Sequence, residues 1–305
     1  MPPSTNPSQP EPQPQPQSTM PLPKKPLTLI VATTPLTSPQ SGHQRLGIGL
    51  NGTLPWPRIK TDMSFFARVT TRPPSEIPGS TNAMIMGRKT YDSVPASLRP
   101  LGKRLSVILS RGGEGGKGGL GERVRRDLER KLEKEKERER ELAQEKEKAQ
   151  TQTQEQGQGQ GQGTQKGEEK RGGKQTSAII ATSLPSALDE LDHTYSKPDS
   201  HPLVGHVFVI GGAEIYRSAL DLPSTQPLRI VMTHVEKLSG EKFECDTFFP
   251  VDEELEDPGL WRTASAEEVT GWVGEVVTGE WIEEGDVKLE GWFMDFVFDS
   301  NLYLD

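Results

Sequence analysis

Residues 206–216, HVFVIGGAEIY, join a short apolar run to a double glycine and the start of a second pattern. The run up to Ile210 is rich in β-branched and aromatic residues, which is typical of a buried strand. Gly211 and Gly212 form a turn, and residues 213–216 open a helix. A strand that leads directly into a helix is the repeating unit of a parallel α/β sheet.

The same alternation extends in both directions along the chain. We expect further strands at residues 27–33, 83–86, 105–110, 177–181 and 228–234, and helices at residues 60–70, 87–91 and 187–191. The tail from 272 to 298 has the pattern of antiparallel strands with turns at Gly279 and Gly285. The sequence therefore predicts an α/β fold with a mostly parallel central β-sheet, flanking helices and an antiparallel C-terminal edge.

Two segments are too polar to belong to this core. Only 31% of residues are hydrophobic, and the mean hydropathy is −0.64, so part of the chain is expected to be unfolded. Residues 1–26 form a disordered Pro/Gln-rich leader. One domain over 27–305 follows, interrupted at 112–176 by a low-complexity charged and Gln/Gly-rich insertion.

The charges in the insertion give little support to a helix. In residues 133–141, EKEKERERE, opposite charges meet at i,i+3 while like charges meet at i,i+4, so the pair energies largely cancel. Lengthening a surface loop from about 8 to about 70 residues costs only about 2 kcal/mol of closure entropy. We expect a long disordered insertion that the fold tolerates and that catalysis does not need.

Charge and cysteine content bound the function. The net charge of −8 argues against nucleic acid as the main partner, which would need a basic stripe. A single cysteine, Cys245, excludes an intramolecular disulfide and fits a reducing compartment. No apolar signal core or membrane span is present, so we expect a cytoplasmic monomer with no membrane partner, a minor mitochondrial pool being left open.

Two turns between a strand and a helix could bind phosphate. The backbone amides after Gly211-Gly212 and the dipole of the following helix suit an anion, although a bare double-glycine turn is more often structural and the fuller GxGxxG pattern is absent. Gly87-Arg88-Lys89-Thr90 places cations and a hydroxyl at a second such turn, which could also be a solvated turn. Ser110 with Arg111 would add a fork for a ribose phosphate, so together these clusters favour NADPH.

Asp62 is the candidate acid. It lies beside an apolar helical face formed by Met63, Phe66 and Ala67, shortly after Trp56. An aspartate early in a helix is usually a capping or dipole residue. In an apolar cleft, however, a carboxylate could bind the amidine-like edge of a heterocycle and supply a proton, because burial raises its pKa.

Five motifs in order resemble dihydrofolate reductase of the fungal and eukaryotic type. They are residues 30–32 (IVA), 47–56 (GIGLNGTLPW), 85–90 (IMGRKT), 209–212 (VIGG) and 246–250 (DTFFP). The resemblance covers residues 27–111 and 178–298. It implies an NADPH-dependent oxidoreductase that reduces 7,8-dihydrofolate to tetrahydrofolate for one-carbon metabolism, an activity that antifolates target.

The resemblance also assigns roles. Asp62 would hold the 2-amino group and N3 of the pterin and enable protonation at N5, while hydride goes to C6. Trp56 would orient a water, Leu54 would belong to a mobile loop, and Thr233 would support Asp62. The implied substrate contacts are Ile30, Val31, Asp62, Met63, Phe66, Val94, Arg104, Ile210 and Thr233, with Arg104 for the folate α-carboxylate. The implied cofactor contacts are Ala32, Ile48, Gly49, Gly87, Arg88, Lys89, Thr90, Ser110, Arg111, Ile210, Gly211, Gly212, Ala213, Glu214, Ile215 and Tyr216; no metal is expected.

Some positions depart from the family pattern, and two other functions stay open. Met63 replaces a larger residue after the acid, and Thr182 stands where a further cation near the adenosine phosphate would be. The family also has a cis peptide at the double glycine. An NADPH reductase of the riboflavin pathway shares this resemblance, although residues 54–56 with Asp62 favour folate. The other alternative is that the protein is an inactive scaffold that binds partners through its charged insertion.

Overall fold

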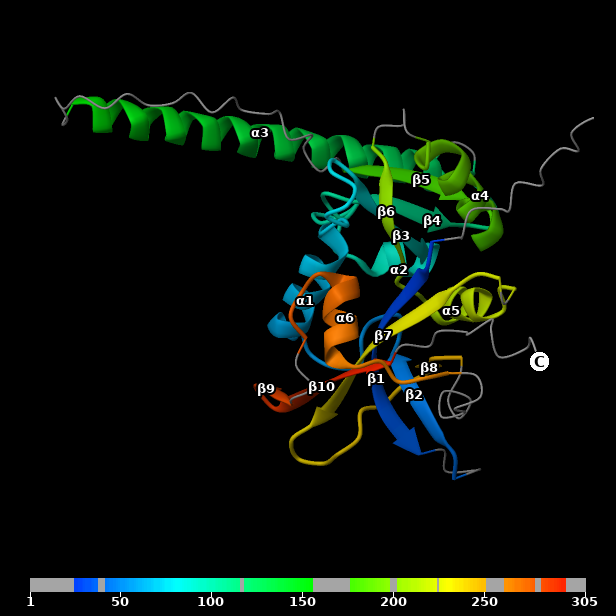
Figure 1. Ribbon diagram of the computed structural model, residues 1–305. Helices are drawn as coiled ribbons and strands as arrows, with labels where there is room; N and C mark the ends of the chain where they lie inside the picture. Colours follow the sequence, from blue (N-terminus) through cyan, green and yellow to red (C-terminus); the bar gives the residue numbers. More distant parts are fainter. Residues whose placement is uncertain are drawn as a thin grey trace, which may run out of the picture.

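The computed structural model describes residues 25–37, 42–115, 118–155, 176–197, 202–223, 225–250, 261–277 and 281–294. A twisted sheet runs through the molecule with helices against it, and one long helix extends past the domain (Figure 1). The leader at 1–24 and residues 156–175 of the insertion lie outside the described residues. Among the described residues, no helix is long and apolar enough to cross a membrane.

Six strands form the parallel part of the sheet. Its order is β5-β4-β3-β6-β1-β7, continued by β10 and β9. The strands are β1 (Leu27–Thr37), β3 (Thr81–Gly87), β4 (Leu105–Leu109), β5 (Ser177–Ala181), β6 (Val204–Val209) and β7 (Leu228–Lys237). Nearly every side chain of β3 and β4 is buried, as expected for strands covered on both faces.

The remaining strands are antiparallel. β10 (Val287–Met294) pairs with β7, and β9 (Ile282–Glu284) pairs with β10 through the turn at Gly285, which has a positive φ of 67°. β2 (Gln44–Gly49) pairs with the end of β1, and β8 (Thr247–Phe248) pairs with β2. The predicted fold class, a mostly parallel sheet with flanking helices and an antiparallel C-terminal edge, is confirmed.

The helices cover the sheet on both faces. They are α1 (Lys60–Thr71), α2 (Arg88–Ser93), α4 (Leu184–Tyr195), α5 (Ala213–Leu220) and α6 (Ala266–Val273). Two large apolar clusters, one on each face, contain members from β1, β3, β4 and β6. The strands therefore have their alternate side chains in different cores, which fixes their register.

One tail prediction is wrong. Residues 272 and 273 are the end of helix α6 rather than part of a strand, and the first described strand of the antiparallel edge is β9, which begins at Ile282. Ser265 accepts a hydrogen bond from the Glu268 amide, Glu268 caps in return, and Gly274 ends the helix in the left-handed conformation. This capping box is a local helix signal. Gly279, the other expected turn, lies outside the described residues.

The insertion also differs from expectation at its start. Leu120–Glu155 is a continuous helix, α3, of 36 residues. Leu120 and Val124 are buried in the same cluster as Met86 and Tyr91. The predicted absence of packing is therefore wrong for the first turns of α3, because these apolar side chains lie four residues apart on one helix face.

Candidate active site

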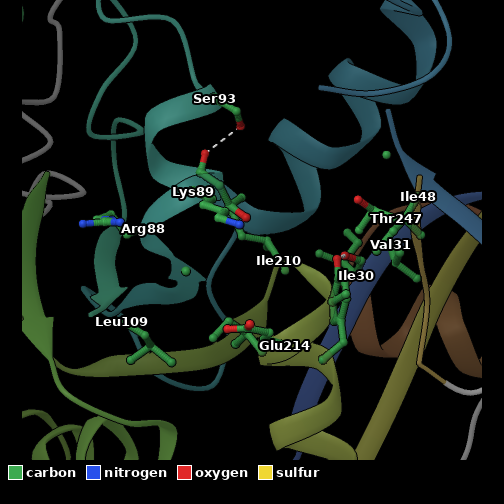
Figure 2. Close-up of a pocket in the computed structure, with 18 of the residues that line it drawn as sticks. Ile30, Val31, Ile48, Arg88, Lys89, Ser93, Leu109, Ile210, Glu214 and Thr247 are labelled. Carbon is green, nitrogen blue, oxygen red and sulfur yellow. Dashed lines mark hydrogen bonds between the residues drawn. The ribbon is translucent and has the colours of Figure 1, made fainter. Parts of the chain in front are cut away.

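A cavity of about 940 Å³ opens at the ends of the central strands. Its wall comprises the middle of β1, the residues at the ends of β3, β4 and β6, and side chains of α1, α2 and α5. Figure 2 shows Ile30 of β1, Lys89 of α2 and Glu214 of α5 around it. In open α/β sheets, ligands bind in the crevice beyond the carboxyl ends of the strands. Its volume is at the upper end of the range for small-molecule sites.

Most of the predicted site residues meet in this one cavity. Those that line it are Ile30, Val31, Ala32, Ile48, Gly49, Leu54, Asp62, Met63, Phe66, Gly87, Arg88, Lys89, Thr90, Ser110, Arg111, Ile210, Gly211, Gly212, Ala213, Glu214, Ile215, Tyr216 and Thr233. They come from segments as far apart in the chain as Ile30 and Thr233. Trp56, Val94 and Arg104 do not belong to the lining.

Trp56 lies behind the cavity wall. Its ring is buried and meets Phe243 edge-on, with ring centroids 5.9 Å apart. Ile59 and Val235 complete the same apolar cluster. Trp56 therefore anchors the approach to α1 and stands close to Asp62 in sequence without facing the cavity.

Several lining residues were not predicted. They include Phe65, Ser93, Ser183, Leu184, Pro185, Ser218 and Thr247. Thr182, which the resemblance placed near the adenosine phosphate, also lines the cavity. Ser183 caps α4 through a hydrogen bond from the Ser186 amide, and Pro185 lies in its first turn. A serine followed by a proline two residues later is a known signal for the start of a helix, so the start of α4 could have been predicted from the sequence. What the sequence could not show is that α4 begins at the cavity.

Asp62 is a desolvated carboxyl group. Its side chain is partly exposed because it lines the cavity, while the surrounding protein removes it from bulk water. Burial raises the pKa of Asp62 to about 6. A hydrogen bond with Thr233 lowers this pKa by a smaller amount, and the negative charge of Glu284 raises it slightly further. A carboxyl group with this pKa can hold and release a proton near neutral pH.

Glu284 fixes the start of the helix that carries Asp62. Ile59, at the N-cap of α1, provides no side-chain hydrogen bond. The amide of Lys60 instead donates to Oε1 of Glu284 at 2.7 Å, and the amide of Thr61 donates to Oε2 at 2.9 Å. A carboxylate from β9 thus takes the place of the missing cap.

The double glycine is held closely against the sheet. The Gly211–Gly212 peptide is cis, and Gly211 has φ 99°. A Cβ on Gly211 would lie 2.9 Å from the ring of Tyr216. That ring is buried, and its hydroxyl donates to the carbonyl of Ile30 at 2.8 Å. The turn therefore requires glycine and joins β6, α5 and β1 at the cavity.

Three cationic side chains also border the cavity. Arg88, Lys89 and Arg111 all belong to its lining. Arg111 is 91% exposed and lies 3.8 Å from the carboxylate of Glu214. An exposed pair at this distance contributes little. The guanidinium is therefore available to an anionic ligand.

Arg104 is a buried cation outside the cavity lining. It is 6% exposed, and burial lowers the pKa of its guanidinium to about 10. Its described hydrogen bonds go to neutral groups, the hydroxyl of Thr70 and the carbonyl of Gly102. Among the described residues, no ion pair involves Arg104. A charge buried in this way favours an anionic partner.

Comparison with known proteins agrees with the predicted resemblance. A family model described as dihydrofolate reductase matches residues 41–143, from β2 into α3. The dihydrofolate reductase of Cryptococcus neoformans is 30% identical over 287 residues, which cover 87% of this chain and 96% of that protein.

The chain belongs to the dihydrofolate reductase family.

Two further relatives of the same name extend this finding. The dihydrofolate reductase of Pneumocystis carinii is 30% identical over 276 residues, 89% of this chain and 98% of that protein. The solved structure of Schistosoma mansoni dihydrofolate reductase shares the fold with a TM-score of 0.50 at 22% identity, covering 89% of this chain and 98% of that chain. Membership in the dihydrofolate reductase family makes the chain an oxidoreductase.

Proposed function

We propose that this chain reduces 7,8-dihydrofolate to 5,6,7,8-tetrahydrofolate with NADPH. The observation that carries the proposal is the desolvated Asp62 carboxyl, which shares one cavity with the double-glycine turn and the cationic border. The relatives in fungi bear the name of this activity. The presence of Ile30, Met63, Phe66 and Ile210 in the cavity lining supports their proposed role as the walls of a pterin pocket.

The residues of the cavity fit a dinucleotide cofactor. The N-cap of α5, Gly212, provides no side-chain hydrogen bond, and the amide of Ile215 already donates to the Gly212 carbonyl. The amides of Ala213 and Glu214 would therefore be the ones that receive a phosphate. Arg88, Lys89 and Arg111 supply the positive charge that a 2′-phosphorylated nucleotide requires. Ala32, Ile48, Ile210 and the adjacent glycines would hold the nicotinamide end. When bound, NADPH would supply the hydride that C6 receives.

The protein's part in the reaction is to bind, orient and protonate. Asp62 would bind the 2-amino group and N3 of the pterin, with Thr233 holding the carboxyl in place. Ile30, Phe66 and Ile210 would provide an apolar wall that excludes water. Protonated Asp62, directly or through a water, would deliver the proton that N5 requires. Arg104 would bind the folate α-carboxylate from outside the described cavity.

An assay of NADPH oxidation tests this proposal. With dihydrofolate, we expect turnover that methotrexate abolishes. The same enzyme should show no turnover with the ribosylated pyrimidine that a riboflavin-pathway reductase uses. Activity on the pyrimidine alone, or on neither substrate in a folded protein that binds NADPH, would contradict the proposal.

Removing the charge of Glu284 should shift the pH profile of the reaction. Hydrogen bonds from Thr61 and Lys60 hold the pKa of Glu284 below its ordinary value, so it is anionic and raises the pKa of Asp62. In Glu284→Gln the pKa of Asp62 should fall, and less of it is protonated above pH 6. We expect kcat/KM at pH 7.5 to drop about two- to fivefold and to be unchanged at pH 5.

The neighbouring Glu283 provides the matched control. It is an exposed glutamate on the same strand, so Glu283→Gln removes the same charge without touching the α1 amides. An identical pH profile for Glu284→Gln and the wild type would show that Glu284 does not act on Asp62.

Arg111 should decide the preference for NADPH over NADH. Its side chain reaches the cavity with only a weak ion pair to offset its charge. In Arg111→Gln we expect kcat/KM for NADPH to fall about tenfold while the value for NADH is unchanged, because charge-assisted hydrogen bonds to phosphate are lost. Arg217→Gln, an exposed arginine on α5 outside the cavity, is the control. An equal loss with both nucleotides would place Arg111 away from the 2′-phosphate.

A further inference from the structure

The first turns of α3 make a buried polar contact with α2. Tyr91 of α2 is 1% exposed, and its hydroxyl donates to Oδ2 of Asp127 at 2.9 Å. Asp127 is itself buried. Leu120 and Val124 of α3 pack in the apolar cluster that contains the Tyr91 ring. A helix that the composition assigned to solvent thus supplies a buried acceptor and two core residues.

The charge of Asp127 is matched by two arginines. Arg130 donates to Oδ1 one turn further along α3, and Nε of Arg99 lies 3.5 Å from Oδ2. The guanidinium of Arg99 also lies 5.3 Å from the centre of the Tyr91 ring. A buried carboxylate is tolerated where hydrogen bonds and opposite charges surround it in this way. Neutralising Asp127 would remove the acceptor that Arg99 and Arg130 share, although Arg99 would keep its ion pair with Asp92.

The same segment of α3 holds residues 94–104. Arg130 donates to the carbonyl of Ala96 at 3.1 Å. Gly102 lies so close to α3 that a Cβ there would be 2.8 Å from Oε1 of Glu135. Glu135 in turn accepts from the hydroxyl of Thr176, which accepts from the amide of Lys103 at 2.7 Å. These contacts run from Asp127 to the residue before Arg104.

α2 lines the cavity, and residues 94–104 follow it directly and carry two of the substrate contacts that the resemblance implies. Lys89, Thr90 and Ser93 of α2 line the cavity, and residues 94–104 carry Val94 and Arg104. The side chains of residues 136–146 are all exposed, and the far part of α3 extends away from the domain (Figure 1). The contacts of α3 with α2 and residues 94–104 come from its first turns, residues 120–135.

We propose that Asp127 is a positioning residue, through which residues 120–135 of the insertion hold α2 and residues 94–104 in the geometry that binds substrate and cofactor. The inference rests on the proposed function for the identity of these ligands. It also revises the expectation that the whole insertion is dispensable, because a deletion of 113–174 would remove Asp127 with the rest.

Asp127→Asn in the full chain tests this role. The amide keeps the size and one acceptor but loses the charge that faces Arg99 and Arg130. We expect the KM for dihydrofolate and the dissociation constant of NADPH, read by intrinsic tryptophan fluorescence, each to rise about tenfold. The kcat and its pH dependence should be unchanged, because Asp62 lies on α1. Glu139→Gln, an exposed position on the same helix, should leave all four quantities unchanged.

Tyr91→Phe completes the test and keeps it decisive if Asp127→Asn does not fold. Removing only the hydroxyl should raise the same two constants by a smaller factor. In the double variant the effect should be no larger than for Asp127→Asn alone, because both changes break one contact. A folded Tyr91→Phe or Asp127→Asn protein that loses stability to urea with both constants unchanged would overturn the proposal. The NADPH measurement needs no turnover, so a failure of the reductase activity itself is distinguishable.

Discussion

Asp62→Asn should lower kcat with dihydrofolate at pH 7 by about a hundredfold to ten-thousandfold, the usual contribution of a positioned acid. The amide can still accept a hydrogen bond from the pterin and from Thr233, but it has no proton to give to N5. The KM for NADPH should be unchanged, because the cofactor residues lie on other elements. Single-turnover kinetics would show the loss in the hydride-transfer step. Near-normal turnover of this variant would remove Asp62 from the mechanism.

The same variant should be more stable than the wild type at neutral pH. The pKa of Asp62 rises from 3.8 to about 6 on folding, so its contribution to stability is present below pH 3.8 and is lost as the pH rises through 6. The free energy of unfolding of the wild type relative to Asp62→Asn should therefore fall by up to about 3 kcal/mol between pH 4 and pH 7. Urea unfolding at both pH values measures this difference. A constant difference would show that Asp62 is not desolvated.

Arg104→Gln should raise the KM for dihydrofolate about a hundredfold, the effect of losing one partner of a buried charge pair. The kcat should change little, because Arg104 lies away from the reacting atoms. A reduced pterin without the glutamate moiety separates the two explanations, since the variant and the wild type should use it equally well. Lys103→Gln, an exposed neighbouring cation, is the control. An equal loss on both substrates would mean that Arg104 supports the fold rather than the carboxylate.

Local patterns were sufficient to predict the parallel sheet. Each of its strands is a short apolar run, and the motifs lie where a strand ends, so the site residues on them were brought together by topology alone. β2 was missed because residues 44–49, QRLGIG, contain only two large apolar residues and pair with a continuation of β1 beyond the predicted run. The helix α6 was missed although its capping box was present.

Contacts over long distances in the chain could not be predicted. Glu284 caps α1 from 224 residues away, and nothing in the local sequence of either segment indicates this pairing. Asp127 meets Tyr91 across 36 residues. In α3 the charge pattern of residues 133–141 obscured a real signal, because Leu120, Val124 and Asp127 share one helical face just before it. Composition describes a whole segment, whereas packing depends on a few of its positions.

The pH dependence of hydride transfer tests the central claim most directly. The rate would be followed by stopped-flow from pH 5 to pH 9 with preformed enzyme–NADPH complex and dihydrofolate, and repeated with deuterated NADPH to identify the step. If Asp62 must carry a proton, the rate should be highest below pH 6 and fall about tenfold for each further pH unit. A rate that does not change over this range, or that rises with pH, would contradict the role of Asp62.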